Sequence, residues 1–515
     1  MIDPNRLLVP LLAGSLAMPL AAQDLQLDVR GVSMPGEFVL DAYPAQVSFE
    51  PVLILPSLTT GTVPLQLVDP NDFRTLSVGI DLLDLAWLAF SDPTGHATVT
   101  VPFPAAPALA GIPIYAQAVT FAFGVTLVDR ISNPNAVYLG NAGAFQDRSV
   151  AFGTERAFAT AIVRADRSVL LCGGSRGQLL AQVATAQTES YDVMTDSWGA
   201  GPMMNGARSL HRMTQLYDGT WLFTGGVDGG NNPRPTCEIY DPVTNTFTPV
   251  ASMNSPRMGH TATALADGRV FVSGGLEAVS VQPTQLEAIH DAVATTEIYD
   301  PFADTWTPGP TMSTPRAAHV ALHRPDGKIL LCGGISWSPN IIFGWVPAVR
   351  SSCELYDPFT DSLSSGPSMA EERALLDPIE LEPGKWLLAG GMNGLSIIPF
   401  NPGNPTATAE IYDSTTNSWT SVAPMAQARA NHQVWALGND AFLVAGGAAD
   451  SILSPTPLQT TEIYSATTQT FSPGPPLNAP RAAPAMIETH QGQILLMGGA
   501  DTATSILDTT EWYYF

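Results

Sequence analysis

Residues 256–275 and 296–306 have the sequences PRMGHTATALADGRVFVSGG and TEIYDPFADTW, and these two segments decide the fold. The first contains Arg257, a short segment of small and apolar residues at 261–265 and the Asp-Gly turn at 267–268. A four-residue, mainly apolar segment at 270–273 and the Gly-Gly doublet at 274–275 follow. Asp-Gly between two such runs is typical of a tight β-hairpin. The second segment contains a short strand, a turn with Asp and Pro, and an aromatic residue. Together they predict a unit of four antiparallel strands, A to D from the inside outwards.

The same pattern occurs seven times along the chain. An arginine precedes each Gly-Gly doublet by 17 residues, and a glutamate two residues before a tyrosine follows each doublet. A large apolar residue stands nine residues after each of the first six glutamates, and the next arginine comes ten residues later. Fixed spacings of this kind indicate a repeat architecture. The repeated residues are Arg156, Arg208, Arg257, Arg316, Arg373, Arg429 and Arg481, with Glu189, Glu238, Glu297, Glu354, Glu410, Glu462 and Glu511.

These motifs resemble the Kelch repeat family, whose unit of about 50 residues forms one blade of a β-propeller. The resemblance covers about residues 145–515 and extends to the galactose-oxidase-like superfamily. It implies an all-β fold, a seven-bladed Kelch β-propeller. Two departures are local, since Leu363 replaces the aromatic residue of the fourth unit and Ser465 replaces the aspartate of the sixth.

The seventh unit lacks an outer strand, because the sequence stops at its strand C. Residues 145–152 have the spacing of the missing strand relative to Arg156. We therefore expect residues 145–155 to supply the closing outer strand of the last blade and to remove the open edge of the ring. Phe145 lies one residue too far upstream, which predicts a β-bulge.

Composition excludes several classes of partner. A net charge of −25 disfavours nucleic acid and anionic membranes, which would repel the protein. Arg6, the apolar stretch of residues 7–20 and two alanines are typical of a signal peptide. We therefore expect residues 1–22 to be removed and the protein to be secreted, periplasmic or on a bacterial cell surface. No later stretch has 18 uninterrupted apolar residues, so we expect no membrane span.

Residues 23–144 precede the repeats. Alternating runs at 97–101 and 112–117, with a turn at 91–95, predict a small β-sandwich. This region resembles accessory β modules of secreted bacterial proteins, which suggests a role in adhesion, spacing or docking.

The repeated arginines and glutamates have two interpretations. They could form a ring of ligand contacts, or each arginine could pair with a glutamate and with backbone carbonyls between strands. We favour structural pairs, in which loss of one partner leaves the other charge buried.

Four histidines stand three residues after a repeat arginine, on strand A, which lines the central channel. Imidazoles suit Zn or Cu. However, residues spread round a channel lie too far apart for metal–nitrogen bonds of about 2 Å. We therefore predict no metal site and no cofactor. The four are His211, His260, His319 and His432.

The cysteines occupy two repeated positions, and only the fourth unit holds both, at Cys332 and Cys353. In an oxidising compartment these two could form a disulfide. Alternatively, the positions accept small buried residues, since other units place Ser273 or Ala389 there. We favour the second interpretation.

Variation in length is confined to the B–C loop, between the Gly-Gly doublet and the glutamate. The intervals are 16, 13, 23, 21, 20, 16 and 13 residues. Variable loops on a rigid scaffold commonly carry binding sites, and exposed aromatics stack on sugars or anchor protein interfaces. The same residues could instead pack on each other or dock the N-terminal domain. The candidate binding residues are Trp337, Phe343, Trp345, Arg350, Phe400, Arg176 and Arg234.

Two families of enzymes with Kelch-like propellers suggest an enzymatic function. Galactose oxidase resembles this chain and holds copper with tyrosines and histidines, including an adjacent Tyr-His pair, which this sequence lacks. Sialic-acid epimerases also have Kelch-like propellers, but no site residue can be matched. We therefore predict a monomeric, non-enzymatic scaffold that binds protein or carbohydrate through its B–C loop face. The alternative is a carbohydrate-active enzyme related to those two families.

Overall fold

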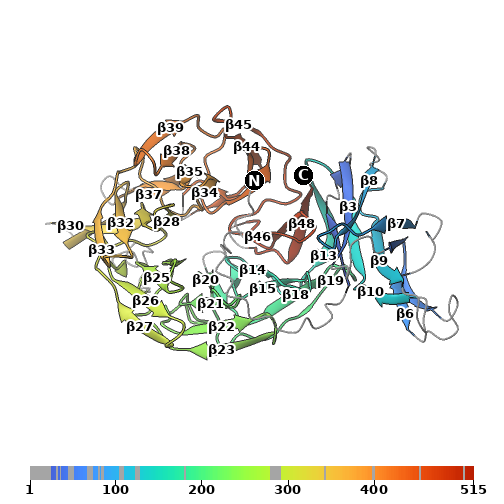
Figure 1. Ribbon diagram of the computed structural model, residues 1–515. Coiled ribbons are helices and arrows are strands. Elements are labelled where there is room, and N and C mark those ends of the chain that lie inside the picture. Colours follow the sequence, from blue (N-terminus) through green and yellow to red (C-terminus); the bar gives the residue numbers. More distant parts are fainter. Residues whose placement is uncertain are drawn as a thin grey trace.

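The computed structural model describes residues 25–30, 33–34, 36–43, 51–65, 74–78, 82, 86–103, 109–121, 128–178, 181–278, 291–340, 344–396, 401–451, 454–502 and 505–514. Regular structure in these ranges consists of β-strands, with no α-helix. The prediction of an all-β propeller is confirmed. Figure 1 shows sheets arranged in a ring around a central channel, with a smaller group of strands beside the ring.

Each of the seven repeats forms one four-stranded antiparallel sheet, with its first strand at the channel and its last strand at the outside (Figure 1). The sheets, from the channel outwards, are β14 (Thr160–Val163), β15 (Val169–Cys172), β18 (Thr188–Asp192) and β19 (Ser197–Ala200); β20 (Arg212–Gln215), β21 (Trp221–Thr224), β22 (Cys237–Asp241) and β23 (Thr246–Val250); β24 (Thr261–Ala264), β25 (Val270–Ser273), β26 (Thr296–Asp300) and β27 (Thr305–Pro308); β28 (Val320–His323), β29 (Ile329–Cys332), β32 (Cys353–Asp357) and β33 (Ser362–Ser365); β34 (Ile379–Glu382), β35 (Lys385–Ala389), β38 (Ala409–Asp413) and β39 (Ser418–Val422); β40 (Gln433–Gly438), β41 (Ala441–Ala445), β44 (Thr461–Ser465) and β45 (Thr470–Pro473); and β46 (Ala485–Glu488), β47 (Ile494–Met497), β48 (Thr509–Tyr514) and β13 (Ala144–Ala151).

Neighbouring sheets approach closely where the Gly-Gly doublets end the second strands. In the second sheet the Gly226 N–H donates to the carbonyl of Arg257, the repeat arginine of the next sheet, at 2.7 Å. A Cβ at Gly225 would lie 2.4 Å from that same carbonyl oxygen. The second strands are buried on both faces, as in β25 and β29. The doublet is therefore required because one sheet's backbone meets the next sheet's backbone at this point.

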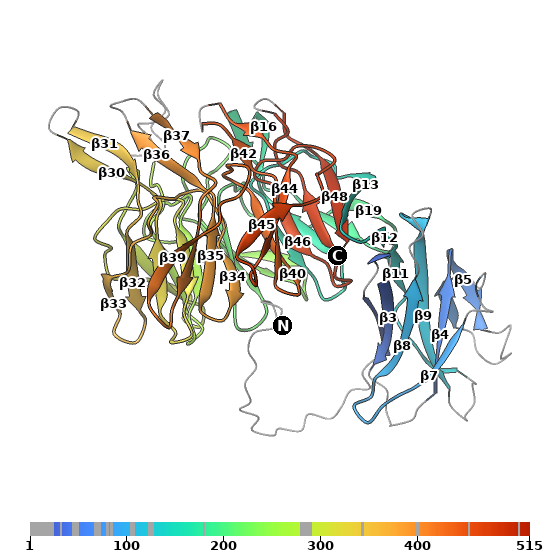
Figure 2. The ribbon, with the colours of Figure 1, turned by 90° about the horizontal axis from the view of Figure 1, so that it is seen from above.

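Among the described residues, the B–C loops of four sheets contain additional two-stranded hairpins. These hairpins project from the same side of the ring (Figure 2), which we call the hairpin-bearing face. The turns between first and second strands lie on the opposite face. The hairpins are β16 (Ser175–Gln178) with β17 (Ala181–Ala184), β30 (Ile335–Asn340) with β31 (Gly344–Val349), β36 (Met392–Ser396) with β37 (Asn401–Pro405), and β42 (Ala448–Ala449) with β43 (Thr456–Pro457).

The last sheet combines the two ends of the repeat region. Strand β13 pairs antiparallel with β48, with Phe145 opposite Tyr513 and Asp147 opposite Glu511. The register shifts between Asp147 and Ala151, so the strand is irregular there. Pairing covers the outer edge of β48, which would otherwise expose free backbone groups.

The N-terminal strands form separate small sheets. They are β1 (Gln26–Arg30), β3 (Gly36–Tyr43) and β8 (Ala97–Phe103) in one sheet; β10 (Val128–Ile131), β9 (Pro113–Phe121), β4 (Pro51–Ser57) and β7 (Trp87–Phe90) in a second, with β11 (Asn135–Tyr138) also paired to β9; β5 (Thr60–Pro64) with β6 (Thr75–Val78); and β2 (Ser33–Met34) with β12 (Gly140–Asn141).

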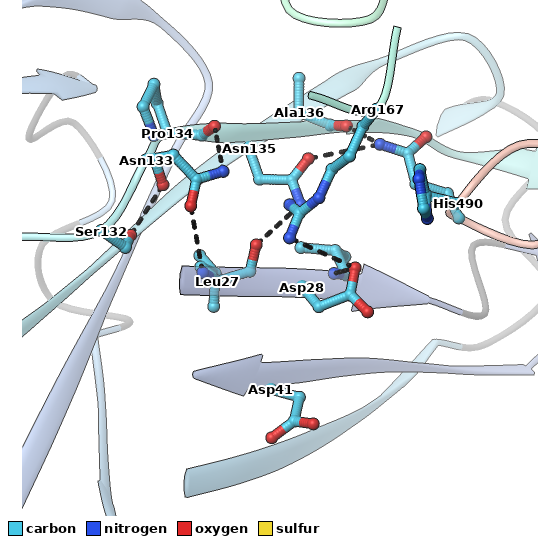
Figure 3. Close-up of polar contacts among 12 residues, drawn as sticks. Leu27, Asp28, Asp41, Ser132, Asn133, Pro134, Asn135, Ala136, Arg167 and His490 are labelled. Carbon is cyan, nitrogen blue, oxygen red and sulfur yellow. Dashed lines mark hydrogen bonds and ion pairs between the residues drawn. The ribbon is translucent and has the colours of Figure 1, made fainter. Parts of the chain in front are cut away.

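These N-terminal strands pack against the first and last sheets of the ring. Arg167, in the turn after β14, lies 3.6 Å from the Asp28 carboxylate of β1 (Figure 3). Gln491, in the turn after β46, donates to the carbonyl of Ala136. One apolar cluster includes Leu27 and Trp512. Both turns lie on the face opposite the hairpins, so these described contacts of the N-terminal strands are on that opposite face (Figure 2).

Candidate functional site

The repeated arginines and glutamates form buried pairs within the wall of the ring. In the third sheet the Arg257 guanidinium lies 2.8 Å from the Glu297 carboxylate and donates to the carbonyl of Gly274 at 2.8 Å. Glu297 also accepts the backbone N–H of Asn254 at 2.6 Å. Equivalent ion pairs join the arginine and glutamate of all seven repeats, and the arginine side chains are at most 2 % exposed. These groups are therefore occupied and out of reach of a ligand.

A tier of backbone hydrogen bonds surrounds the channel just beyond these pairs. The residue two positions after each repeat arginine has a left-handed φ, between 51° and 59°. Its N–H donates to the carbonyl of the equivalent residue in the preceding sheet, as from Ala318 to Gly259 at 2.7 Å. Six such bonds connect the residues Phe158, Leu210, Gly259, Ala318, Leu375, Asn431 and Ala483.

Each of the four channel histidines comes one residue after a tier residue in the sequence. His211 lies 3.0 Å from the Thr160 hydroxyl, His260 lies 2.8 Å from the Thr224 hydroxyl, and His319 lies 2.8 Å from the Ser273 hydroxyl. Burial lowers the pKa of His211 and of His432 to about 3, with nearby arginines acting in the same direction. These imidazoles are therefore neutral. Within the described residues no three His, Cys, Asp or Glu side chains form a group that could hold a metal ion.

A cavity of about 330 Å³ lies within the backbone tier, and we call it the channel-mouth cavity. All seven tier residues line it, and so do Leu276 and Ile335, which directly follow Gly-Gly doublets. It therefore opens on the hairpin-bearing face. Four polar lining residues stand four positions after a repeat arginine, namely Thr160, Arg212, Asp377 and Gln433.

Arg212 and Asp377 give the channel-mouth cavity two charged groups. The Arg212 Nε–H donates to the carbonyl of His260 at 2.8 Å, and its other two nitrogens have no hydrogen-bond partner among the described residues. Asp377 accepts a hydrogen bond from the Gln433 amide at 3.2 Å. Burial raises the pKa of Asp377, while the positive charge of Arg212 and the Gln433 hydrogen bond oppose that shift.

The B–C loop residues predicted to bind a partner have different environments. Trp337, on β30, is half-buried and donates from Nε1 to the carbonyl of Ala292 at 3.3 Å. Arg350 donates to the carbonyl of Trp337 at 2.8 Å. Arg234 is half-buried and donates to the carbonyl of Ala207 at 2.7 Å. The polar groups of these three residues thus support the loops themselves.

Of the remaining predicted residues, Arg176 and Trp345 belong to described strands, and two others do not. Arg176 is exposed on β16. Trp345 belongs to β31, while Phe343 and Phe400 lie outside the described residues.

The hairpins of the fourth and fifth sheets pack against each other. Val349 of β31 and Met392 and Leu395 of β36 belong to one buried cluster, with Ile335 of β30 packed against it. In the described part of these loops, apolar side chains therefore hold the hairpins together. Ile335 and Leu375, which pack against this cluster, also line the channel-mouth cavity.

The sequence interpretation missed Arg212, Asp377 and Gln433. The fourth position after the repeat arginine varies strongly between units, but the positions on either side of it vary as well, so this variation alone does not mark it. The residues there are Thr160, Arg212, Thr261, Val320, Asp377, Gln433 and Ala485. The closed ring places four of these residues, Thr160, Arg212, Asp377 and Gln433, at the cavity.

Cys332 and Cys353 are direct cross-strand partners on β29 and β32, and all four cysteines are buried free thiols in this structure. The next pair, Gly333 and Ser352, is joined by an N–H to carbonyl bond of 3.2 Å. Cys332 and Cys353 therefore occupy a non-hydrogen-bonded pair, whose Cα atoms are typically about 4.5 Å apart. This separation is compatible with a disulfide.

We expect mild oxidation with diamide to link Cys332 to Cys353 and to leave Cys172 and Cys237, which lie in different sheets, as thiols. Alkylation of the unfolded protein followed by peptide mass spectrometry measures this. A bond involving Cys172 or Cys237, or four alkylated thiols after oxidation, would contradict the geometry.

Comparison with known proteins gives two kinds of match. A sequence profile of the Kelch motif matches residues 224–254 and 387–426. A fungal alcohol oxidase of the AA5 family, solved in complex with copper, is structurally similar with a TM-score of 0.54 and 18 % identity, over 71 % of this chain and 75 % of that chain. The structure of YjhT gives a TM-score of 0.42 and 14 % identity, over 70 % of this chain and 95 % of that chain. No curated protein matches the sequence.

Proposed function

This chain is a Kelch-repeat β-propeller, and from that premise we propose that it binds a protein partner at its hairpin-bearing face. The channel-mouth cavity receives one group of that partner, and the hairpins contact the surface around it. The observation that carries the proposal is a cavity, lined by all seven repeats, that contains an Arg212 guanidinium with two nitrogens free of described partners.

The composition of the channel-mouth cavity favours a polypeptide over a carbohydrate. Most of its lining is apolar, including Phe158, Leu210, Met258 and Leu375. Apolar walls with a few placed polar groups are typical of sites that take an apolar group in one orientation. A volume of about 330 Å³ is near the lower end of ligand-site volumes, so the site suits one side chain rather than an extended ligand.

We also propose that the protein is exported from the cell and acts as a monomer. The signal-peptide residues 1–22 lie outside the described residues. The described part of the chain contains no apolar helix long enough to cross a membrane. A binding protein with an acidic surface charge and an N-terminal export signal fits an extracellular or periplasmic role.

Copper-dependent oxidation is the second candidate function, because the fungal alcohol oxidase was solved with copper. The channel-mouth cavity does not fit such a metal, because its lining contains two histidines and no tyrosine or cysteine. The described residues also contain no group of three His, Cys, Asp or Glu that could ligate it. Three of the four channel histidines also place a ring nitrogen within hydrogen-bond distance of a threonine or serine hydroxyl. We therefore derive no oxidation step for this chain.

The test fills the channel-mouth cavity. Ala318, a half-buried lining residue, is replaced with Trp, and the matched control places Trp at Val243, which is 91 % exposed on the opposite face. Peptides are first selected on the unmodified protein from a random display library, and the same protein is applied to a glycan array. We expect the selected peptides to lose at least about tenfold in affinity for Ala318→Trp, equivalent to about 1.4 kcal/mol, and to keep it for Val243→Trp.

The melting temperature of both variants serves as the folding control. Selected peptides that bind Ala318→Trp unchanged would refute the proposed face. Glycan binding abolished by Ala318→Trp, without any peptide binding, would replace the protein partner with a carbohydrate.

A further inference from the structure

The channel-mouth cavity contains a single positive charge among its described lining residues. Its other basic side chains, His211 and His432, are neutral because burial lowers the pKa of each to about 3. Arg212 is therefore the group of this lining that attracts an anion, and Asp377 is the one acidic residue among the described lining residues. Arg212 forms no ion pair with a described acidic residue, in contrast to the seven buried repeat arginines.

Arg212 is held in place for recognition of a planar anion. Its Nε–H is fixed on the carbonyl of His260, which belongs to the third sheet, at 2.8 Å. The two terminal nitrogens remain free of described partners. A guanidinium with two such nitrogens forms strong, charge-assisted hydrogen bonds to the two oxygens of a carboxylate.

The other side of the channel offers hydrogen-bond acceptors. Asp377 and Gln433 come from the fifth and sixth sheets, across the ring from β20 (Figure 1). Asp377 uses one oxygen for the Gln433 amide. Its second oxygen has no hydrogen-bond partner among the described residues. A donor on the ligand, opposite its carboxylate, would satisfy that oxygen.

Apolar side chains occupy the space between these groups. Leu210, Leu375, Leu376 and Met258 line the cavity. A ligand that satisfies every wall therefore has a carboxylate, an N–H donor and an apolar side group within one small unit. The C-terminal residue of a polypeptide has these three features in one residue.

We propose that the channel-mouth cavity binds the C-terminal residue of the partner polypeptide. Its α-carboxylate contacts Arg212, its main-chain N–H donates to Asp377, and its apolar side chain packs on Leu210 and Leu375. This inference rests on the proposed function and specifies which part of the partner enters the cavity.

The experiment uses N-acetyl-L-leucine as the probe, because it reproduces a C-terminal leucine with its amide. Binding to the full-length chain is measured by ligand-observed NMR and calorimetry, beside N-acetyl-L-leucinamide and octanoate. We expect the acid to bind at least about tenfold more tightly than the amide, because only the acid offers Arg212 a charged hydrogen-bond acceptor. Octanoate keeps the carboxylate and an apolar chain but lacks the N–H donor, so it is expected to bind more weakly than the acid.

Three variants test the assigned residues. Arg212→Gln is expected to remove the preference for the acid over the amide, and Arg212→Lys to restore part of it. Arg269→Gln, which changes an arginine in the turn before β25, on the opposite face and outside the cavity lining, is the matched control and is expected to bind like the unmodified protein. Asp377→Asn is expected to weaken N-acetyl-L-leucine and to leave octanoate unchanged.

Two results would overturn the inference. One is equal affinity for the acid and the amide, and the other is tighter binding of octanoate than of N-acetyl-L-leucine. If neither probe binds while selected peptides bind and lose affinity in Ala318→Trp, this inference fails and the proposed function stands. If the selected peptides also bind Ala318→Trp unchanged, both fail.

Discussion

Replacing Arg257 with Ala is expected to lower the free energy of unfolding by about 3–5 kcal/mol, which is the typical cost of breaking a buried ion pair. The guanidinium contacts Glu297 and donates to the carbonyls of Gly274 and Thr295. Removing it leaves the Glu297 carboxylate buried without its cation, because that side chain is only 3 % exposed. Urea denaturation followed by tryptophan fluorescence measures the loss.

An exposed ion pair in the same sheet provides the control. Arg269 lies 2.7 Å from Asp267, with side chains 34 % and 49 % exposed. Exposed pairs contribute about 0–1 kcal/mol, so Arg269→Ala is expected to have a small effect. Similar losses for the two variants would contradict the assignment of the repeated arginines to the wall.

Replacing Gly226 with Ala is expected to lower the free energy of unfolding by about 2–5 kcal/mol, the sum of backbone strain and overpacking. Gly226 has a φ of 86°, and a Cβ there would lie 2.5 Å from the backbone oxygen of Ser209. Ser209 belongs to the same repeat, and its backbone has little freedom to move away because its carbonyl accepts the Val227 N–H at 2.8 Å.

The same sheet contains a glycine that separates these two costs. Gly219 also has a φ of 86°, but a Cβ there would meet no atom within 4 Å. Gly219→Ala is expected to cost only the backbone strain, about 1–2 kcal/mol. Chemical denaturation of both variants gives the difference, and equal losses would show that the close approach at the doublet has no energetic weight.

The sequence predicts the ring well because each repeated residue interacts within its own sheet or with the adjacent one. Arg257 reaches Glu297 inside its repeat, and the Gly226 N–H reaches the carbonyl of Arg257 in the next. Interactions of this range appear in the sequence as constant spacings. The strand that pairs with β48 could also be predicted, because an unpaired edge requires a partner.

The channel-mouth cavity could not be predicted in the same way. Arg212, Asp377 and Gln433 lie on the second, fifth and sixth sheets, and the closed ring brings them to one cavity. No fixed spacing connects them along the chain. The loop position of Trp337 predicts ligand binding, and its Nε1 donates to the carbonyl of Ala292 in the B–C loop of the preceding repeat, a contact for which the sequence contains no signal.

The repeat pattern likewise does not predict the contact between the N-terminal strands and the ring. Gln491 occupies a turn position that other repeats fill with different residues, and its amide donates to the carbonyl of Ala136 more than 300 residues earlier. The contact depends on one particular turn meeting one particular strand, so periodicity gives no indication of it.

Hydrogen–deuterium exchange, with and without a peptide selected on the unmodified protein, tests directly which face of the ring is used. We predict slower exchange at the cavity-lining segments and unchanged exchange at the turns on the opposite face. The first group is residues 158–160, 210–212, 375–377 and 431–433, and the second is residues 241–246, 300–305 and 357–362. Slower exchange in the second group with no change in the first would contradict the account.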